Sequence, residues 1–480
     1  MPNLVRRAAC VSAVKPDRPR GLKPAARCFV ALAVVFVALA VCDAMPANVH
    51  AQGARVFDPP DPANFFQNTT FAIDGRIGYV PTFGRDMLWS FDVLTGRIID
   101  PDGLVLPGVN ASDPFLTAGE RLVIPGWFPN QAVLVADISN PADLKVAGVI
   151  PVVGQVNIQG QNIEMSAGGI IGFVASFPND TLYSFNVDTM SLEDPDGLAL
   201  PGNPDRIALA GDRLALVDTT NGRIMVADVS NPANLTLAGV ITLPGGNSFG
   251  SNDNIVFAAD GRTGFVSNQQ RAIHSFDVVS LSVVDPDGLP FGTQGFGDHV
   301  ALHGDTLAAI YSRGLTFVDV SDPADMHIIS EAQFGGTVAP QGDARVAFSR
   351  DGTRAAMPVI FPAMRVYVFD VATGAQAANP FPVDDQPNFL TVFQPGDRVG
   401  VACSGIDADN VYLIHNLVSK TGDGDDDGDV DLVDVSGFQD CYSGSGGGVG
   451  PQCEPFDLDG DKDIDLRDWA ALATNMTGAL

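Results

Sequence analysis

Short runs of alternating apolar and polar residues recur along most of this chain, separated by Gly, Pro, Asn and Asp. The segment FAIDGRIGYV (71–80) contains two such runs around Asp74 and Gly75, a pattern typical of a β-hairpin. It returns as FAADGRTGFV from Phe257 and FSRDGTRAAM from Phe348. Each copy is followed by a third and a fourth apolar run, without a helical period. The pattern therefore predicts four-stranded antiparallel units.

The units repeat at a regular interval. The phrase VADVSNPANLTLAGVI (226–241) recurs at 135–150 and 317–332, and it alternates with a second phrase, of which SFDVLTGRII (90–99) is one copy. One residue marks each of eight units, at intervals of 42 to 51 residues: Asp92, Asp137, Asn186, Asp228, Asp277, Asp319, Asp370 and His415. Repeats of this length indicate stacked or radial arrays. A radial array protects sheet edges, so we predict an all-β fold, a β-propeller of about eight four-stranded blades at 52–418.

The two ends of the repeat region indicate how the ring closes. The eighth unit, 384–418, has three strand patterns and lacks the fourth. The apolar segment ARVF (54–57) precedes the first unit and has no other evident role. We predict that this segment supplies the missing strand, because pairing both ends of the ring in one blade suppresses fraying. A seven-bladed ring with one degenerate unit is the alternative.

Both phrases resemble known propeller repeats. VADVSNPANLTLAGVI and its copies are similar to the LVIVD-type repeats of bacterial surface propellers, and the SFDV units with their upstream DG hairpins resemble YVTN-type repeats. The resemblance covers roughly residues 67–417 and implies the propeller fold. Some YVTN-like propellers are lactonases, so it also implies a hydrolase as one candidate function. Propellers in general host many unrelated activities.

Candidate catalytic residues are sparse in the repeat region. His299 and His303 lie four residues apart, but DHVALHGD is typical of a strand and turn, which would separate the two side chains by about 13 Å. The glutamates are scattered over different units: Glu120, Glu164, Glu193 and Glu331. No Ser/His/Asp arrangement stands out. The repeated Asp-Pro-Asp-Gly at 100–103, 194–197 and 285–288 is interpreted as a turn, with a cation site between blades as the alternative.

Residues 1–51 have the pattern of a signal peptide. A long basic region precedes the apolar run FVALAVVFVALAVC (29–42), which is short for a membrane span and suits a signal-peptide core. Small residues predict cleavage before Gln52, and an uncleaved anchor is the alternative. We expect a secreted or cell-surface protein with no membrane span after cleavage. The net charge of −30 argues against binding nucleic acid or anionic lipid and fits a protein that meets cations.

Residues 419–480 contain two acidic loops with the spacing of calcium-binding loops. The first, DGDDDGDVDLVD, has acidic residues at positions 1, 3, 5, 7, 9 and 12: Asp423, Asp425, Asp427, Asp429, Asp431 and Asp434. The second, DLDGDKDIDLRD, uses Asp457, Asp459, Asp461, Asp463, Asp465 and Asp468. Val430 and Ile464 are the apolar eighth residues. Lys462 takes the sixth position, where a left-handed backbone is needed at some cost. We therefore expect two Ca²⁺ sites, the second weaker.

Each loop is followed by a short helix-like run, VSGFQDCY or WAALATNM. With Asp at position 12, this segment resembles a type I dockerin more than an intracellular EF-hand. The resemblance implies a small α-helical calcium domain that docks to a cohesin-like or cell-surface protein in polysaccharide-degrading assemblies. Positions 10 and 11, which help to choose the partner in dockerins, are Leu432-Val433 and Leu466-Arg467 rather than polar pairs.

Two cysteines and the domain order complete the sequence-based description. Cys441 and Cys453 flank a Gly-rich run and are predicted to form a disulfide, which an oxidising compartment permits. We favour a secreted, non-catalytic binding or scaffold protein, in which the propeller recognises a protein or glycan ligand and the tail docks it to a partner. The alternative is a secreted hydrolase or lactonase-like enzyme linked to polysaccharide catabolism by its tail.

Overall fold

The computed structural model describes most residues between Ala54 and Met476. Outside the described residues lie 1–53, several loop segments of which 153–161 and 334–345 are the longest, and 415–421, 423–429 and 477–480. The predicted signal peptide and most of the first acidic loop therefore fall outside the described residues. The chain divides into two units, Met1–Ala51 and Gln52–Leu480. Within the described part, no helix has the length and apolarity needed to cross a membrane.

The described strands form eight antiparallel sheets, one for each repeat unit. We number these sheets as blades one to eight in chain order. Blades one to four contain β2 (Phe65–Phe66), β3 (Thr70–Phe71), β4 (Ile77–Phe83), β5 (Met87–Asp92) and β6 (Leu104–Val105); β7 (Val109–Ala111), β8 (Phe115–Leu116), β9 (Arg121–Pro129), β10 (Ala132–Asp137) and β11 (Lys145–Pro151); β12 (Ile163–Met165), β13 (Ile171–Ser176), β14 (Thr181–Asn186), β15 (Ser191–Leu192) and β16 (Leu198–Ala199); and β17 (Pro204–Ala210), β18 (Arg213–Asp218), β19 (Arg223–Asp228) and β20 (Thr236–Thr242).

Blades five to eight follow the same plan. They contain β21 (Ile255–Phe257), β22 (Thr263–Ser267), β23 (Ala272–Asp277), β24 (Ser282–Val283) and β25 (Leu289–Pro290); β26 (Gly297–His303), β27 (Thr306–Tyr311), β28 (Gly314–Asp319) and β29 (His327–Gln333); β30 (Ala347–Phe348), β31 (Arg354–Val359), β32 (Arg365–Asp370) and β33 (Phe381–Pro382); and β34 (Gln386–Phe393), β35 (Arg398–Ser404), β36 (Val411–Ile414) and β1 (Ala54–Phe57). The only described helices are α2 (Leu432–Cys441) and α3 (Leu466–Asn475). The predicted all-β propeller with a short helical tail is confirmed.

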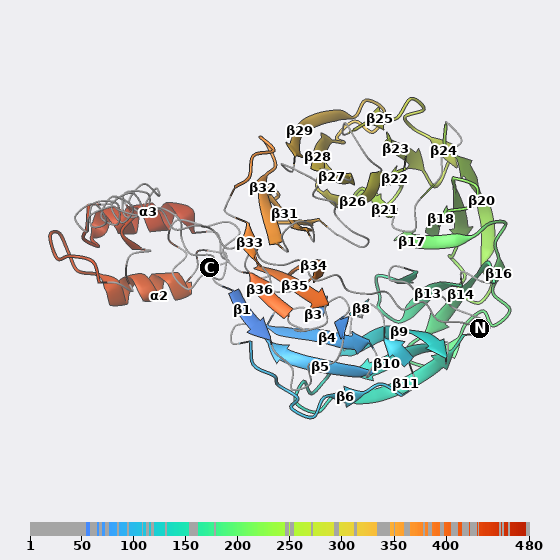
Figure 1. Ribbon diagram of the computed structural model, residues 1–480, viewed down its shortest axis with the longest axis horizontal. Helices are drawn as coiled ribbons and strands as arrows, with labels where there is room; N and C mark the ends of the chain where they lie inside the picture. The colour runs from blue at the N-terminus through green and yellow to red at the C-terminus, as the bar shows by residue number, and fades with distance from the viewer. Residues whose placement is uncertain are drawn as a thin grey trace, which may run out of the picture. The chain divides into compact units, whose positions relative to one another are not determined.

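The blades are arranged around a centre, with β17, β21 and β26 on the inside and β20, β24 and β29 at the periphery (Figure 1). Contacts run from each blade to the next, including the apolar packing of blade six on blade seven and β2 of blade one against β35 of blade eight. Blade eight is completed by β1, which pairs antiparallel with β36 in the register Ala54↔Ile414 to Phe57↔Val411. The predicted closure of the ring by residues 54–57 is therefore confirmed.

The apolar core lies between neighbouring blades rather than inside any one of them. One cluster joins Leu182 of blade three to Met225 of blade four, and another joins Phe317 of blade six to Phe348 of blade seven. Middle strands are buried on both faces because a blade packs against a neighbour on each side; β10 and β19 are buried over most of their length. This explains why the ADVS strands are apolar runs that do not alternate strictly.

Glycines recur where a large aromatic ring crosses the facing strand. Gly172 lies opposite Phe185 in the β13–β14 ladder, and a Cβ on Gly172 would come within 2.1 Å of that ring. Gly78 and Gly264 have the same relation to Phe91 and Phe276. The Gly of each GFV or GYV phrase and the Phe of each SFD phrase are therefore one packing unit, which is why they recur together.

The Asp or Asn that marks a repeat forms a polar turn at the end of its strand, as in six of the described units. The eighth marker, His415, lies outside the described residues. Asp228 accepts hydrogen bonds from the backbone N–H and the hydroxyl of Ser230, and Asn186 accepts them from the N–H groups of Asp188 and Thr189. These turns fix the backbone two or three residues onward. The Ser230 hydrogen bonds, followed by the Arg213 guanidinium, lower the pKa of Asp228 to about 2. The recurring Asp or Asn therefore indicates a turn at the end of the strand.

Candidate functional site

The Asp-Pro-Asp-Gly turns connect neighbouring blades. In blade three, one oxygen of Asp194 accepts the N–H of Gly197 at 3.1 Å, and the other accepts the N–H of Leu235 in blade four at 2.9 Å. Ser184 donates to the carbonyl of Pro232 in the same neighbouring segment. Gly197 has φ +66°, as the predicted turn requires.

We call this pair of hydrogen bonds, which link one Asp to its own turn and to the next blade, the clasp. The same clasp joins blades one and two through Asp100, which accepts the N–H of Gly103 at 3.2 Å and that of Leu144 at 3.0 Å. Backbone donors occupy both carboxylate oxygens, so the turn interpretation is confirmed and the alternative of a cation site has no support from this geometry. The two repeat phrases alternate because they supply the two sides of this contact. One phrase supplies the Asp and the Ser. The other supplies the Asn-Pro-Ala segment, whose Pro carbonyl accepts from the Ser and whose following Leu N–H donates to the Asp.

The predicted strand at His299 and His303 is also confirmed. His299 and His303 lie on one strand, β26, and not on a helix. His299 is buried, whereas the His303 ring packs 5.8 Å from the ring of Phe348 in blade seven. The two histidines therefore lie in different surroundings and do not form a shared site.

The second acidic loop is a compact turn that ends at α3. Asp457 Oδ2 accepts the N–H of Lys462 at 3.1 Å, and Asp468 accepts the N–H groups of Leu458 at 2.6 Å and Asp465 at 2.8 Å. Asp465 is the N-cap of α3 and forms a capping box with Asp468, which stabilises the first turn of this helix. Lys462 has φ +70°, so its predicted left-handed backbone is confirmed.

Three carboxylates of this loop converge. Ligand atoms of Asp463, Asp465 and Asp468 all lie within 4.8 Å of one another, and Asp468 is fully buried. Asp457 Oδ1 and Asp463 Oδ1 are buried without a hydrogen-bond partner among the described atoms. Burying such oxygens unpaired is costly, and a hard cation that prefers oxygen ligands would satisfy them. The donor set therefore fits calcium.

The remaining predicted ligands are less well placed. Asp461 is exposed and does not join the group of three, although its Oδ1 accepts the N–H of Asp463. Asp459 lies outside the described residues, as do Asp423, Asp425, Asp427, Asp429 and Asp431 of the first loop. Asp434, the last position of that loop, is buried at the first turn of α2. Asp463 differs from expectation, because its side chain and not only its carbonyl faces the cluster.

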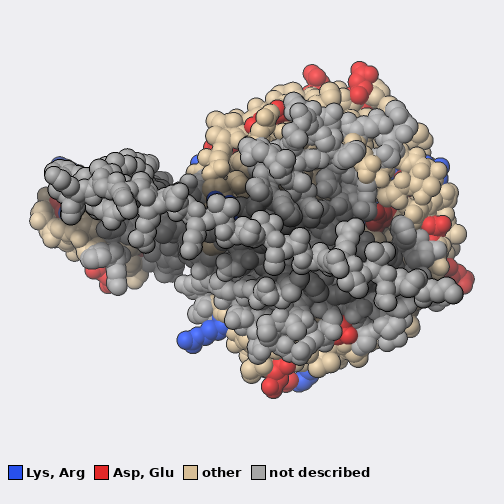
Figure 2. Space-filling view, in the orientation of Figure 1, with Lys and Arg blue, Asp and Glu red and all other residues tan. Residues whose placement is uncertain are grey.

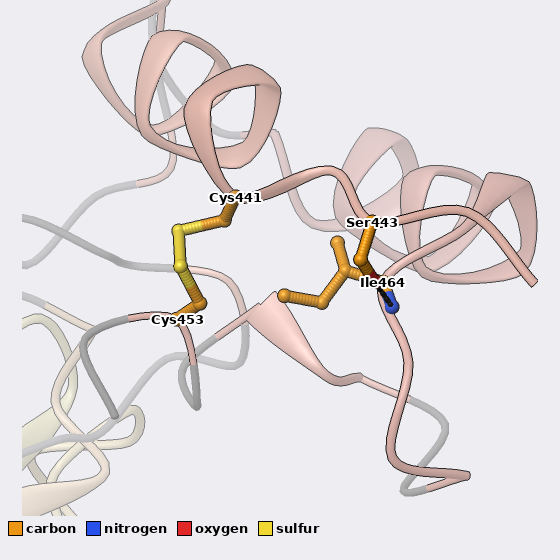
Figure 3. The surroundings of a disulfide bond; sticks show 4 residues. All are labelled: Cys441, Ser443, Cys453 and Ile464. Atoms are coloured by element: carbon orange, nitrogen blue, oxygen red, sulfur yellow. Dashed lines mark hydrogen bonds between the residues drawn. A yellow bond between two sulfur atoms is a disulfide. The ribbon is translucent and has the colours of Figure 1, made fainter. Parts of the chain in front are cut away.

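The segment between the helices packs against the second loop. Cys441 and Cys453 form a disulfide with a Cα–Cα distance of 5.4 Å. Figure 3 shows Ser443, inside this closed segment, beside Ile464: its hydroxyl accepts the N–H of Ile464 at 3.0 Å, and its own N–H donates to the Ile464 carbonyl at 3.0 Å. Gly446 N–H also donates to Asp463. The Gly-rich insertion thus holds the backbone of the second loop.

A small apolar core joins the two loops and helices. Val430 and Ile464, the eighth residues of the loops, are fully buried there together with Phe438, Phe456 and Leu472. Trp469 is partly buried against the same cluster, with its ring 5.6 Å from that of Phe438. The apolar eighth residue of each loop therefore packs into this core, as the sequence pattern predicts.

One functional candidate was missed from the sequence. Glu164 on β12 lines a cavity near the centre of the ring together with residues of three other blades. Scattered along the chain, the four glutamates showed no common site. A register comparison of the inner strands would have singled out Glu164, because the other four strands compared below have Ala or Val at its position.

Comparisons with known proteins agree with the fold. Residues 201–242 and 300–332 match the model of the LVIVD repeat. No curated protein matches this chain. Among solved structures, the computationally designed Ika8 protein is 11% identical, with 74% of this chain and 98% of that chain covered and a TM-score of 0.56. The C-terminal WD40 domain of Sif2 is 10% identical, with 76% and 98% covered and a TM-score of 0.57. Identities this low show the fold alone, and the chain is a β-propeller protein that contains LVIVD repeats.

Proposed function

We propose that this protein is a secreted, non-catalytic binding platform with a calcium-dependent docking tail. The closed ring of repeats with LVIVD character supports the platform role. The signal-peptide pattern at 1–51 and the pairing of Cys441 with Cys453 support export, since disulfides persist in oxidising compartments. Mass spectrometry of exported protein should find a start near Gln52.

The tail binds two calcium ions. The observation that carries this proposal is the convergence of Asp463, Asp465 and Asp468, together with the buried Oδ1 of Asp463 that lacks a hydrogen-bond partner among the described residues. Asp457, Asp459, Asp461, Asp465 and Asp468 provide side-chain oxygens in the second loop, and Asp463 provides its carbonyl, its side chain, or both. Without a cation these carboxylates repel one another, so calcium binding contributes directly to folding of the tail.

Docking uses the beginning of each helix. Leu432 and Leu466 hold the tenth position of the two loops and are 60% and 70% exposed, respectively. They are chemically alike and occupy equivalent positions on α2 and α3. The partner is therefore a cohesin-like or cell-surface protein that offers an apolar surface at this contact, rather than the polar one that Ser-Thr pairs would select.

The calcium proposal is tested by calorimetry on residues 52–480. Calcium should bind with a stoichiometry of two, and hydrogen exchange in α2 and α3 should slow when it is added. Asp468→Ala should remove one site, because this carboxylate holds the N–H groups of Leu458 and Asp465 and faces the cluster. Lys462→Gly should tighten the second site by relieving the left-handed backbone, worth about 1 kcal/mol or fivefold in affinity.

Asp440→Ala is the matched control, since Asp440 is an exposed aspartate of α2 outside both loops. It should leave both sites intact. Equal binding by the Asp468→Ala and wild-type proteins, or equal hydrogen exchange with calcium and with a chelator, would contradict the proposal.

The cavity composition bears on the enzyme alternative. Hydrolysis of a lactone or glycan usually needs a second acid, base or nucleophile beside the first. Among the residues that line the described cavity, Glu164 is the single titratable one. This composition favours ligand binding over hydrolysis. Turnover of any compound in a panel of lactones and glycans would instead favour the enzyme alternative.

A further inference from the structure

A cavity of about 520 Å³ lies where the inner strands of four consecutive blades meet. Its wall contains Glu164 of β12, Leu209 of β17, Phe257 of β21 and Leu302 of β26, together with further residues of blades four, five and six. The volume lies in the range of small-molecule sites, and such sites combine apolar walls with a few polar groups. The side chains of this wall are apolar apart from one carboxyl group, that of Glu164.

Glu164 differs from the residues at the same register position in the other blades. In five inner strands the preceding residue is buried and β-branched: Ile163, Ile207, Ile255, Val300 and Val346. The next residue is Glu164, Ala208, Val256, Ala301 or Ala347, respectively, so four of the five are Ala or Val. In blades one, two and eight the position of Glu164 is held by Thr70, Phe115 and Thr391, and none of these carries a carboxyl. A carboxyl is therefore not needed to build the blade. Its presence in blade three calls for a different explanation.

The carboxyl of Glu164 is poorly solvated. The side chain is partly accessible through the cavity, yet protein surrounds it. Burial raises its pKa to about 7, and a hydrogen bond from the backbone of Met165 opposes this shift only in part. A group that is costly to ionise in the empty cavity gains most from a ligand that carries a positive charge to it.

The titratable groups on the strands around β12 do not supply a positive charge to Glu164. Of the strands packed against it, β13 has no titratable residue, and β17 carries Asp205 and Arg206. Both are buried with interactions of their own. β26, which also lines the cavity, carries Asp298, His299 and His303, and the two histidines are the ones whose side chains are described. None of the described groups shifts the pKa of Glu164.

We propose that this cavity binds a small organic ammonium compound, with its charged nitrogen at the carboxylate of Glu164 and its apolar body against Leu209, Phe257 and Leu302. A divalent metal is a poorer fit, because one carboxylate offers too few oxygens for calcium or magnesium. An anionic ligand would meet no basic side chain on the described wall. The net charge of −30, with acidic side chains spread over the described face of the propeller in Figure 2, attracts cations to the molecule.

The inference extends the platform role of the propeller and is independent of the tail. The test uses residues 52–480 with saturating calcium, and titrates n-hexylamine, 1-hexanol and hexanoate by calorimetry at about pH 8, where both Glu164 and the amine are charged. Hexylamine should bind, and the other two compounds should bind at least about tenfold more weakly. Glu164→Gln should weaken hexylamine to a similar extent, whereas Glu120→Gln, which removes an exposed carboxylate, should not.

A second measurement uses the wild-type protein only. Below the pKa of Glu164, an ammonium ligand must displace its proton, so binding at about pH 6 should release close to one proton and binding at pH 8 far fewer. Calorimetry in two buffers with different ionisation enthalpies measures this number. Absence of hexylamine binding, equal binding of 1-hexanol, equal affinity of the Glu164→Gln variant, or no proton release at pH 6 would each overturn the inference. Calcium titration of calcium-free portions of the same preparations shows separately whether the tail is intact.

Discussion

At the scale of single residues, Glu164 shows how a local sequence pattern conceals a site. It sits in an alternating strand, and alternation alone does not say whether a polar residue faces bulk solvent or a cavity between blades. Four blades contribute to its surroundings, so its altered pKa is a property of the assembled ring.

The raised pKa of Glu164 predicts a pH dependence of stability. The folded protein holds the proton up to about pH 7, whereas the unfolded chain releases it near the usual glutamate pKa of 4.5. The stabilising contribution is therefore complete below about pH 4.5 and is lost as the pH rises through 7. Relative to wild type, Glu164→Gln should gain roughly 3 kcal/mol between pH 4.5 and pH 8.

Urea unfolding of both proteins at pH 4.5 and pH 8 measures this gain, because other titrating groups cancel in the difference. A stability difference that is the same at both pH values would show that Glu164 ionises normally in the folded protein. Glu120→Gln again serves as the exposed control.

At the scale of elements, the alternating repeats work as pairs of blades. The clasp from Asp194 to Leu235 is matched by a second contact in the opposite direction along the ring: Met190 packs over Gly148 of blade two, and Leu281 packs over Gly239 of blade four. Met190 and Leu281 have φ of +54° and +55°, a backbone conformation that residues other than Gly rarely adopt. Their packing between blades offsets that strain, and the glycines beneath them leave the space.

Loss of the clasp should destabilise the propeller. Asp194→Ala removes the acceptor of two backbone N–H groups, including the buried one of Leu235. The expected loss is about 1–3 kcal/mol of unfolding free energy. Thermal and urea unfolding measure it.

Asp196→Ala is the matched control, because Asp196 lies in the same turn and is exposed. It should change the stability by no more than about 0.5 kcal/mol. Equal effects of the two substitutions would mean that the Asp194 hydrogen bonds contribute nothing beyond turn propensity.

At the scale of the whole molecule, the ring depends on a strand that comes from the other end of the repeat region. β1 is the outer strand of blade eight, and it brings residues 54–57 against residues 411–414. Without β1, the backbone groups of β36 on that side lose their partners, and an edge of this kind frays easily.

A protein that begins at Pro59 should therefore melt several degrees below one that begins at Gln52. Hydrogen exchange should rise in β34, β35 and β36 and remain unchanged in β17 to β20, which lie in another blade. Identical melting temperatures, with full protection retained in blade eight, would show that strand closure is dispensable.

Much of the fold could be predicted from the sequence because its signals are local. Hairpins around Asp-Gly, the period of the marker residues and the buried eighth residues of the acidic loops depend on neighbours a few positions away. The closing strand was also predictable, because a missing strand at one end and an unassigned apolar segment at the other left one solution. Lys462 was correctly expected in a left-handed conformation because the loop pattern imposes that backbone.

Only the tertiary structure decided the contacts between residues far apart in sequence. The Asp194 carboxylate meets an N–H group 41 residues away, and no local pattern specifies which neighbour a turn will face. Likewise, Gly446 reaches Asp463 through a disulfide-closed insertion, and the cavity at Glu164 exists because four blades meet there. Sequence by itself determined which segments form strands and turns, since these depend on near neighbours. The packing of blades against one another determined which polar groups became clasps and which became a candidate binding site.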